Sequence, residues 1–129
     1  TELKVVQILP VNDTVATHTW VDSYPYAAIS VEALQPMYAN LQYEGTLKDK
    51  KVQSEIDKEA ARLNALPEVD YEGVMKLKTR FFKLSFEEKG AAFLKSKECN
   101  DVFQSNENWL PEYAAFSDLR YKHGTPECT

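Results

Sequence analysis

The chain has 129 residues, of which 43% are hydrophobic and 27% charged, and its formal net charge is −5. This length predicts one domain with a substantial core, and the composition is ordinary for a globular protein. The acidic balance argues against a nucleic-acid partner, which requires a basic face. No apolar run approaches the roughly 20 residues that span a membrane, and no signal-peptide pattern opens the chain. We therefore expect neither nucleic acid nor a membrane as a partner.

The cysteines and histidines do not follow the spacing of a metal site or of a disulfide framework. Cys99 and Cys128 lie 29 positions apart without a CxxC spacing, and His18 and His123 are isolated from each other. Cys128 also lies next to the chain end, where the backbone is usually loose. We expect no structural disulfide, no metal and no cofactor.

The first segment, Leu3–Leu9, is an almost continuous apolar run that predicts a strand covered on both faces, as in a parallel sheet. Pro10 and the turn-forming residues 12–14 end this strand. In parallel α/β folds, ligands bind beyond the carboxyl ends of the strands, so a site is expected within residues 12–26. A lone buried strand lacks partners for its backbone hydrogen bonds. We therefore expect the chain to be a piece of a larger protein.

Most of the remaining chain is predicted to be helical. The expected pieces are a short helix at 29–34 capped by Ser30, a helix at 48–66, a long helix that begins after Asp70 and breaks or ends at Gly90, a short piece at 91–97, a helix capped by Ser96 or Asn100, and a final helix at 109–122. Residues 37–43 are expected to be extended or irregular, and 106–108 to form a turn.

Two apolar stripes mark the predicted core. One lies on the 48–66 helix, at Val52, Ile56, Ala60 and Leu63. The other lies on the long helix, with Phe81 at its centre and Phe82 and Phe86 widening it. Phe93 has compatible helical spacing, and Tyr113 and Phe116 are also interpreted first as core residues.

The loop at residues 18–30 carries a mixture of side chains that suits a sugar. Its members are His18, Trp20, Asp22, Ser23, Tyr24, Tyr26 and Ser30. Tyr and Trp present a flat apolar face with a polar edge, and Ser and Asp offer short hydrogen-bonding groups. A sugar ring has an apolar C–H face and a rim of hydroxyls. The alternative is an aromatic loop packed against the protein, with its hydroxyls bound to the backbone.

Asp13 and Asp22 invite comparison with the paired carboxylates of a glycosidase. Both lie in turns, where carboxylates usually cap backbone amides. We therefore assign neither of them a catalytic role.

Several segments, taken in order, resemble the 4-α-glucanotransferases of glycoside hydrolase family 77. They are VQILPVNDT at 6–14, WVDSYPY at 20–26, SVEALQP at 30–36, VDYE at 69–72 and NENWLPEYAAF at 106–116. Tyr24, inserted before Pro25, makes the chain similar to the branch that contains the plant cytosolic disproportionating enzyme. The resemblance covers nearly the whole chain.

The resemblance implies a parent (β/α)8 barrel with helical insertions. Residues 1–47 would supply one early barrel strand, the substrate loop and a short helix, and residues 48–129 a helical insertion subdomain of the same catalytic domain. The chain itself would thus be mainly α-helical with one strand. The family transfers α-1,4-glucan segments with retention, in the cytoplasm, through an Asp nucleophile, a Glu acid/base and a second Asp. Those residues lie beyond this chain, so no catalytic residue is assigned here.

The resemblance also implies substrate contacts. Tyr26 matches a loop tyrosine beside the bound sugars, and Asp22, Ser23, Tyr24 and Ser30 match its surroundings. Gln35 stands where the family often has Asn or His. Tyr113 matches a helix tyrosine near an accessory glucan site. The expected partners are an α-glucan or maltooligosaccharide and the rest of the parent barrel; the alternative is a helical binding or interaction module without a catalytic role.

Overall fold

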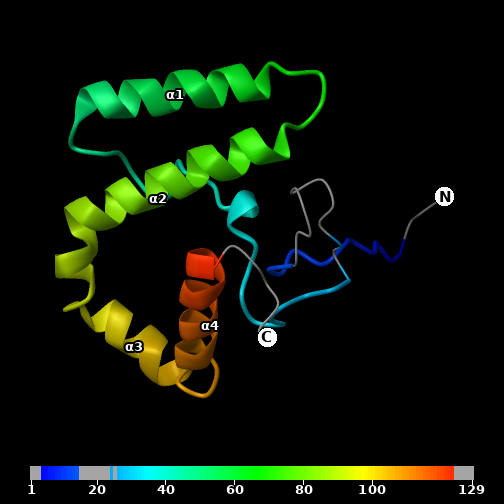
Figure 1. Ribbon diagram of the computed structural model, residues 1–129, viewed down its shortest axis with the longest axis vertical. Helices are drawn as coiled ribbons and strands as arrows, with labels where there is room; N and C mark the ends of the chain where they lie inside the picture. The colour runs from blue at the N-terminus through cyan, green and yellow to red at the C-terminus, as the bar shows by residue number, and fades with distance from the viewer. Residues whose placement is uncertain (1–3, 15–23, 25, 124–129) are drawn as a thin grey trace.

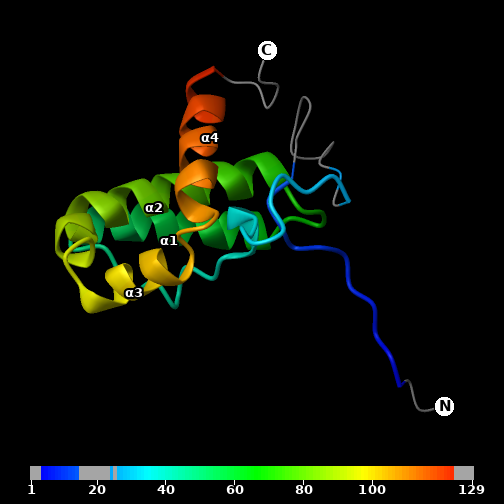
Figure 2. The ribbon, with the colours of Figure 1, turned by 90° about the horizontal axis from the view of Figure 1, so that it is seen from below.

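The computed structural model describes residues 4–14, 24 and 26–123, and these are mainly helical (Figure 1). In chain order, the elements are the 3-10 helix η2 (Pro36–Tyr38) and the α-helices α1 (Lys50–Asn64), α2 (Tyr71–Phe93), α3 (Lys97–Ser105) and α4 (Leu110–His123). Helices α1 and α2 run antiparallel, and α4 stands across this pair (Figures 1 and 2). In the described residues, none of the helices is long and apolar enough to cross a membrane.

The core lies between α1 and α2. Its buried members are Leu47, Ile56, Leu63, Leu77 and Phe81, with Val52, Ala60 and Val74 among the partly buried residues packed against it. Apolar residues three or four positions apart share one face of a helix, so each helix turns its stripe toward the other. The stripe predicted for the 48–66 segment is confirmed.

Three helices begin at a side chain that accepts backbone hydrogen bonds. Asp49 accepts from the N–H groups of Lys51 and Val52 at the start of α1. Asp70 accepts from Gly73 before α2, and Ser96 accepts from Cys99 before α3. These caps satisfy amides that have no partner inside the helix. Asp70 is confirmed as a cap, and Ser96 rather than Asn100 begins α3.

Helix α2 continues through Gly90 to Phe93, so the break predicted at Gly90 is wrong. Gly90 is buried, and a Cβ at this position would meet the Phe86 ring at 2.7 Å. The glycine therefore makes room for an aromatic ring one turn earlier in the same helix. Phe86 and Phe93 are both exposed, so the prediction that they belong to the core is also wrong for this chain.

The strand predicted at Leu3–Leu9 is absent from its described part. Residues 4–10 run as an extended segment away from the helices (Figure 2), and Val5 and Ile8 are 84% and 75% exposed. A strand requires a neighbouring strand to pair its N–H and C=O groups, and the described residues place none beside 4–10. The apolar composition therefore does not by itself produce a strand.

The helix predicted at 29–34 is also wrong, because this segment pairs with residues 11–14 instead. The amide of Gln35 donates to the carbonyl of Val11, and that of Asp13 donates to the carbonyl of Ala33, both at 2.9 Å. Isolated antiparallel bridges join Asn12 to Leu34 and Thr14 to Ala28. Backbone groups used across this pairing are not available for a helix.

The segment between this pairing and α1 is attached to α2. The Lys78 ammonium donates to the carbonyl of Met37 in η2, and burial lowers the pKa of this lysine. Further along, the amide of Lys48 donates to both carboxylate oxygens of Glu88, at 3.1 and 2.9 Å. These contacts hold residues 37–48 against α2. The sequence predicts the first part of this region, residues 37–43, to be extended or irregular.

Candidate functional site

A pocket of about 340 Å³ lies between residues 29–30, at the end of the predicted 18–30 loop, and helix α4. It is lined by Ile29, Ser30, Asn108, Trp109, Glu112, Tyr113 and Phe116. Two of these, Ser30 and Tyr113, are residues that the sequence predicts for the site from widely separated segments. One wall therefore comes from the loop, and the other comes from α4 and the turn before it.

The helix wall is aromatic, and its rings are held in place. The ring centroids of Trp109 and Tyr113 lie 5.9 Å apart, with the planes tilted by 57°. The indole N–H of Trp109 donates to the side-chain oxygen of Asn106 at 3.0 Å, and the Asn106 amide donates to the carbonyl of Val102 at 2.8 Å. Because the indole N–H is bound on the side of α3, the Trp109 ring serves the pocket as an apolar surface.

The loop wall carries the hydroxyl of Ser30. Its oxygen accepts from the amides of Glu32 and Ala33, each at 3.1 Å. The predicted capping by Ser30 is thus present, although a turn follows it and not a helix. A hydroxyl has two acceptor lone pairs and one proton. Since both lone pairs are used, the proton is what this group can offer to a ligand oxygen in the pocket.

Asp13 does not line the pocket but makes hydrogen bonds to residues of both of its walls. The Tyr113 hydroxyl and the Arg120 guanidinium donate to the same carboxylate oxygen of Asp13, at 2.7 and 2.8 Å. The carbonyl of Asp13 accepts from the amide of Ile29 at 2.7 Å. Asp13 is 1% exposed. Its side chain holds the helix wall, and its main chain holds the loop wall.

Arg120 contacts the helix wall a second time. Its guanidinium carbon lies 5.8 Å from the centre of the Phe116 ring, at the outer limit of a cation–π contact. Burial raises the pKa of Tyr113, and the hydrogen bond to the Asp13 carboxylate raises it further, because both favour the neutral phenol. Tyr113 is therefore a neutral donor that points to Asp13 from the edge of the pocket.

The structure brings together part of the predicted site. Tyr24 and Tyr26 pack edge to face with ring centroids 5.7 Å apart, and both are about 60% exposed, so both residues are accessible to a ligand. They are not among the residues that line the pocket. Asp22 and Ser23 lie outside the described residues, as do His18 and Trp20.

The role of Asp13 is different from the prediction. The sequence predicts a carboxylate that caps a nearby backbone amide, whereas the structure pairs it with side chains 100 and 107 positions away. No local pattern signals a contact over that separation. Gln35 is buried as well, and the nitrogen and oxygen of its side-chain amide have no hydrogen-bond partner among the described residues.

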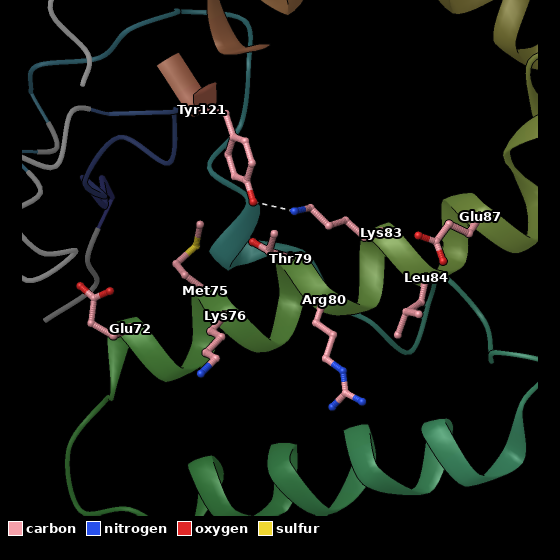
Figure 3. A pocket seen from close by; sticks show the side chains of 9 residues that line it. All are labelled: Glu72, Met75, Lys76, Thr79, Arg80, Lys83, Leu84, Glu87 and Tyr121. Atoms are coloured by element: carbon pink, nitrogen blue, oxygen red, sulfur yellow. Dashed lines mark hydrogen bonds between the residues drawn. The ribbon is translucent and has the colours of Figure 1, made fainter. Parts of the chain in front are cut away.

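A larger hollow, of about 610 Å³, lies along α2 beneath Tyr121 (Figure 3). The Lys83 ammonium donates to the Tyr121 hydroxyl at 2.5 Å and also lies over its ring, while Arg80 points toward α1 and pairs with Glu55 at 2.9 Å. Two acidic and three basic side chains line this hollow, and it contains none of the predicted site residues. The smaller pocket is therefore the better candidate.

Metal chemistry receives no support from the described part of the chain. Among those residues, no three acidic, histidine or cysteine side chains come close enough to hold a metal ion. Cys99 is buried as a free thiol.

Comparison with known proteins identifies the family. The family model for 4-alpha-glucanotransferase, glycoside hydrolase family 77, matches residues 1–129. The chain belongs to this family. The resemblance identified from the sequence motifs is thereby confirmed. A search of the solved structures finds no match.

Three relatives show how much of a 4-alpha-glucanotransferase this chain represents. It is 35% identical over 116 residues to the 4-alpha-glucanotransferase DPE2 of Oryza sativa subsp. japonica. This alignment covers 90% of the chain and 12% of the rice protein. It is 30% identical over 118 residues to the 4-alpha-glucanotransferase of Chlamydia muridarum and 28% identical over 123 residues to that of Chlamydia trachomatis. Each of these two alignments covers 91% of the chain and 21% of the chlamydial protein.

Proposed function

We propose that this chain is a segment of a 4-α-glucanotransferase that transfers α-1,4-glucan segments between maltooligosaccharides or glycans by a retaining double displacement. Family membership and the names of all three relatives support this activity. Residues 1–47 and 48–129 then belong to one catalytic domain, a (β/α)8 barrel with a helical insertion, in a cytoplasmic enzyme. The partners are the glucan and the remainder of the barrel.

The pocket beside α4 contacts the glucan in this proposal. The observation that carries it is the joining of a tilted aromatic pair, Trp109 and Tyr113, with the Ser30 hydroxyl around one cavity. An aromatic face stacks on the C–H face of a sugar, and the hydroxyl rim requires donors and acceptors. The Ser30 proton is a donor, and the Glu112 carboxylate is a strong acceptor. A volume of about 340 Å³ lies within the range of small-molecule sites.

The bond-breaking carboxylates lie elsewhere in the enzyme in this proposal. Retaining transfer requires a nucleophile and an acid/base on either side of the scissile bond. Asp13 is buried and bonded to Arg120 and Tyr113, so it is not accessible to a sugar in this structure. We therefore expect the 129-residue chain to be inactive alone. Disproportionation of maltose by the purified chain would refute that expectation.

Tryptophan fluorescence tests the glucan contact. The chain has two tryptophans, so Trp20→Phe leaves Trp109 as the single reporter in the pocket. Titration with maltoheptaose should give a saturable change in its emission, and titration with a β-1,4-linked glucan oligomer should give none. Absence of a saturable change, in a chain whose helical circular dichroism is intact, would refute the proposed contact.

Matched variants locate the contact. Glu112→Gln removes the pocket carboxylate, whereas Glu107→Gln makes the same change outside the lining. We expect about tenfold weaker binding from the first and no change from the second, since a lost charged hydrogen bond costs about 1.5 kcal/mol or more. Tyr26→Ala tests the loop tyrosine against Tyr43→Ala, another exposed tyrosine. If a variant and its matched control change the binding affinity equally, the sugar does not contact Glu112 or Tyr26, respectively.

A further inference from the structure

We infer that Asp13 and Arg120 are positioning residues for the glucan pocket, and that they act by holding its two walls at a fixed separation. This inference rests on the proposed function, because it concerns the same pocket. Neither residue lines the cavity, so their effect on a ligand passes through their neighbours.

The helix wall depends on Asp13 through two routes. The Asp13 carboxylate accepts a hydrogen bond from the Tyr113 hydroxyl. It also accepts one from the Arg120 guanidinium, which lies over the Phe116 ring. Both Tyr113 and Phe116 line the pocket. The single carboxylate oxygen that receives both donors therefore determines where two of the aromatic rings stand.

The loop wall depends on the same residue through its main chain. The Asp13 carbonyl accepts from Ile29, and the Asp13 amide donates to Ala33, so the ends of the 29–33 segment are both bonded to one residue. Ser30 lies between these two bonds. A shift of Asp13 therefore moves the Ser30 hydroxyl as well as Tyr113.

Burial strengthens the junction between Asp13 and Arg120. Asp13 is 1% exposed and the side chain of Arg120 is 24% exposed, so water does not compete freely for the pair. Charged hydrogen bonds in such surroundings are stronger and more directional than at the surface. By contrast, the Arg62–Glu59 pair on α1 is about half exposed on both sides and far from the pocket in sequence, which makes it a matched control.

The variants are Arg120→Met, Arg120→Lys and Asp13→Asn, with Arg62→Met as the control. In the Trp20→Phe chain, we expect the first and third to weaken maltoheptaose binding about tenfold, Arg120→Lys to weaken it less, and Arg62→Met to leave it unchanged. Without ligand, acrylamide should quench Trp109 more readily in Arg120→Met, because the helix wall is released. Asp13→Asn keeps the shape of the side chain, so it tests the inference even if Arg120→Met does not fold.

Kinetics in the full-length transferase that carries this chain separate positioning from stability. A displaced binding wall weakens ground state and transition state equally, so KM should rise about tenfold with kcat within twofold. Loss of folded enzyme would instead lower kcat at unchanged KM, and this result would overturn the inference. Normal binding by Asp13→Asn and Arg120→Met, with Glu112→Gln still impaired, would overturn the inference alone. No binding by the unmodified pocket would overturn the proposed function and the inference with it.

Discussion

Phe81 and Phe86 lie on the same helix, and truncating each of them should have very different consequences. Phe81 is 1% exposed in the core between α1 and α2, whereas Phe86 is 58% exposed. A buried phenylalanine removes about 200 Å² from water, at about 25 cal/mol per Å². Allowing for the surface that alanine still buries, Phe81→Ala should lower the free energy of unfolding by about 4 kcal/mol, within the range measured for buried aromatic residues.

The same arithmetic gives a small effect for Phe86→Ala. Less than half of the ring is covered, and alanine returns about 0.5 kcal/mol because it favours the helix. The net loss should be about 1 kcal/mol. Urea titration followed by circular dichroism at 222 nm measures both values, and the slope with urea should be unchanged if the native fold is kept.

The result that would refute this reasoning is near-equality. A loss below about 2 kcal/mol for Phe81→Ala, or a loss for Phe86→Ala as large as that for Phe81→Ala, would show that the α1–α2 interface is not the core of this chain. Because domains are stable by only about 5–15 kcal/mol, Phe81→Ala can also abolish the transition altogether, which would agree with the prediction.

The stability of the chain should also respond to changes at Asp13, Arg120, Tyr113, Gln35 and Asp49. In urea titration, Arg120→Met should lower the free energy of unfolding by about 3 kcal/mol, because it leaves the buried Asp13 carboxylate without its charged partner. Asp13→Asn should lower it by about 1 kcal/mol, because the Arg120 guanidinium that loses its partner is partly solvated. The raised pKa of Tyr113 means that the folded state holds the phenol proton more tightly than the unfolded state does. The stabilisation from the Tyr113 phenol is therefore complete below its ordinary pKa of 10.0 and is lost as the pH rises through the raised pKa of the folded state. The difference in the free energy of unfolding between the wild type and Tyr113→Phe should shrink as the pH rises over that range. Gln35→Met should raise the melting temperature, because it removes buried polar atoms without a partner among the described residues. Asp49→Ala should cost about 1 kcal/mol by urea titration, and Asp49→Asn much less.

The helices could be predicted from the sequence because their signals are local. Asp70 and Ser96 each bind an amide three positions later, and the Val52–Leu63 stripe repeats within one helix. The extent of α2 was harder to predict, since Gly90 resembles a helix stop in sequence. In the structure its missing side chain accommodates the Phe86 ring, a reason that depends on packing and not on propensity.

The 29–34 segment shows how a non-local contact overrides a local one. Ser30 makes the capping bonds that begin many helices, but Ala33 and Gln35 use their backbone groups to pair with residues 11–13. An N-cap is worth about 1 kcal/mol, less than a set of backbone bonds that also buries Asp13. The sequence contains both signals, and only the folded chain shows which of them prevails.

The sequence predicts individual residues of the candidate site, but it does not predict the contacts that bring them together. Loop chemistry points to Ser30 and family resemblance points to Tyr113, and the pocket joins them. The link between them is Asp13 with Arg120, which are 107 positions apart and have no pattern in common. Such a pair becomes visible only when α4 is placed against the loop.

The exposed N-terminal segment leads directly into the pairing of residues 11–14 that helps to form the pocket. Residues 4–9 have the composition of a buried strand but are solvent-exposed here, and the relatives are several times longer than this chain. Residues 11–14, directly after them, are already paired with residues 28–35. A strand formed by 4–10 within a longer protein would be continuous with this pairing and would leave Asp13 in the same register. Since both walls of the pocket and the Asp13–Arg120 ion pair come from these 129 residues, the proposed glucan binding can be tested on this chain alone.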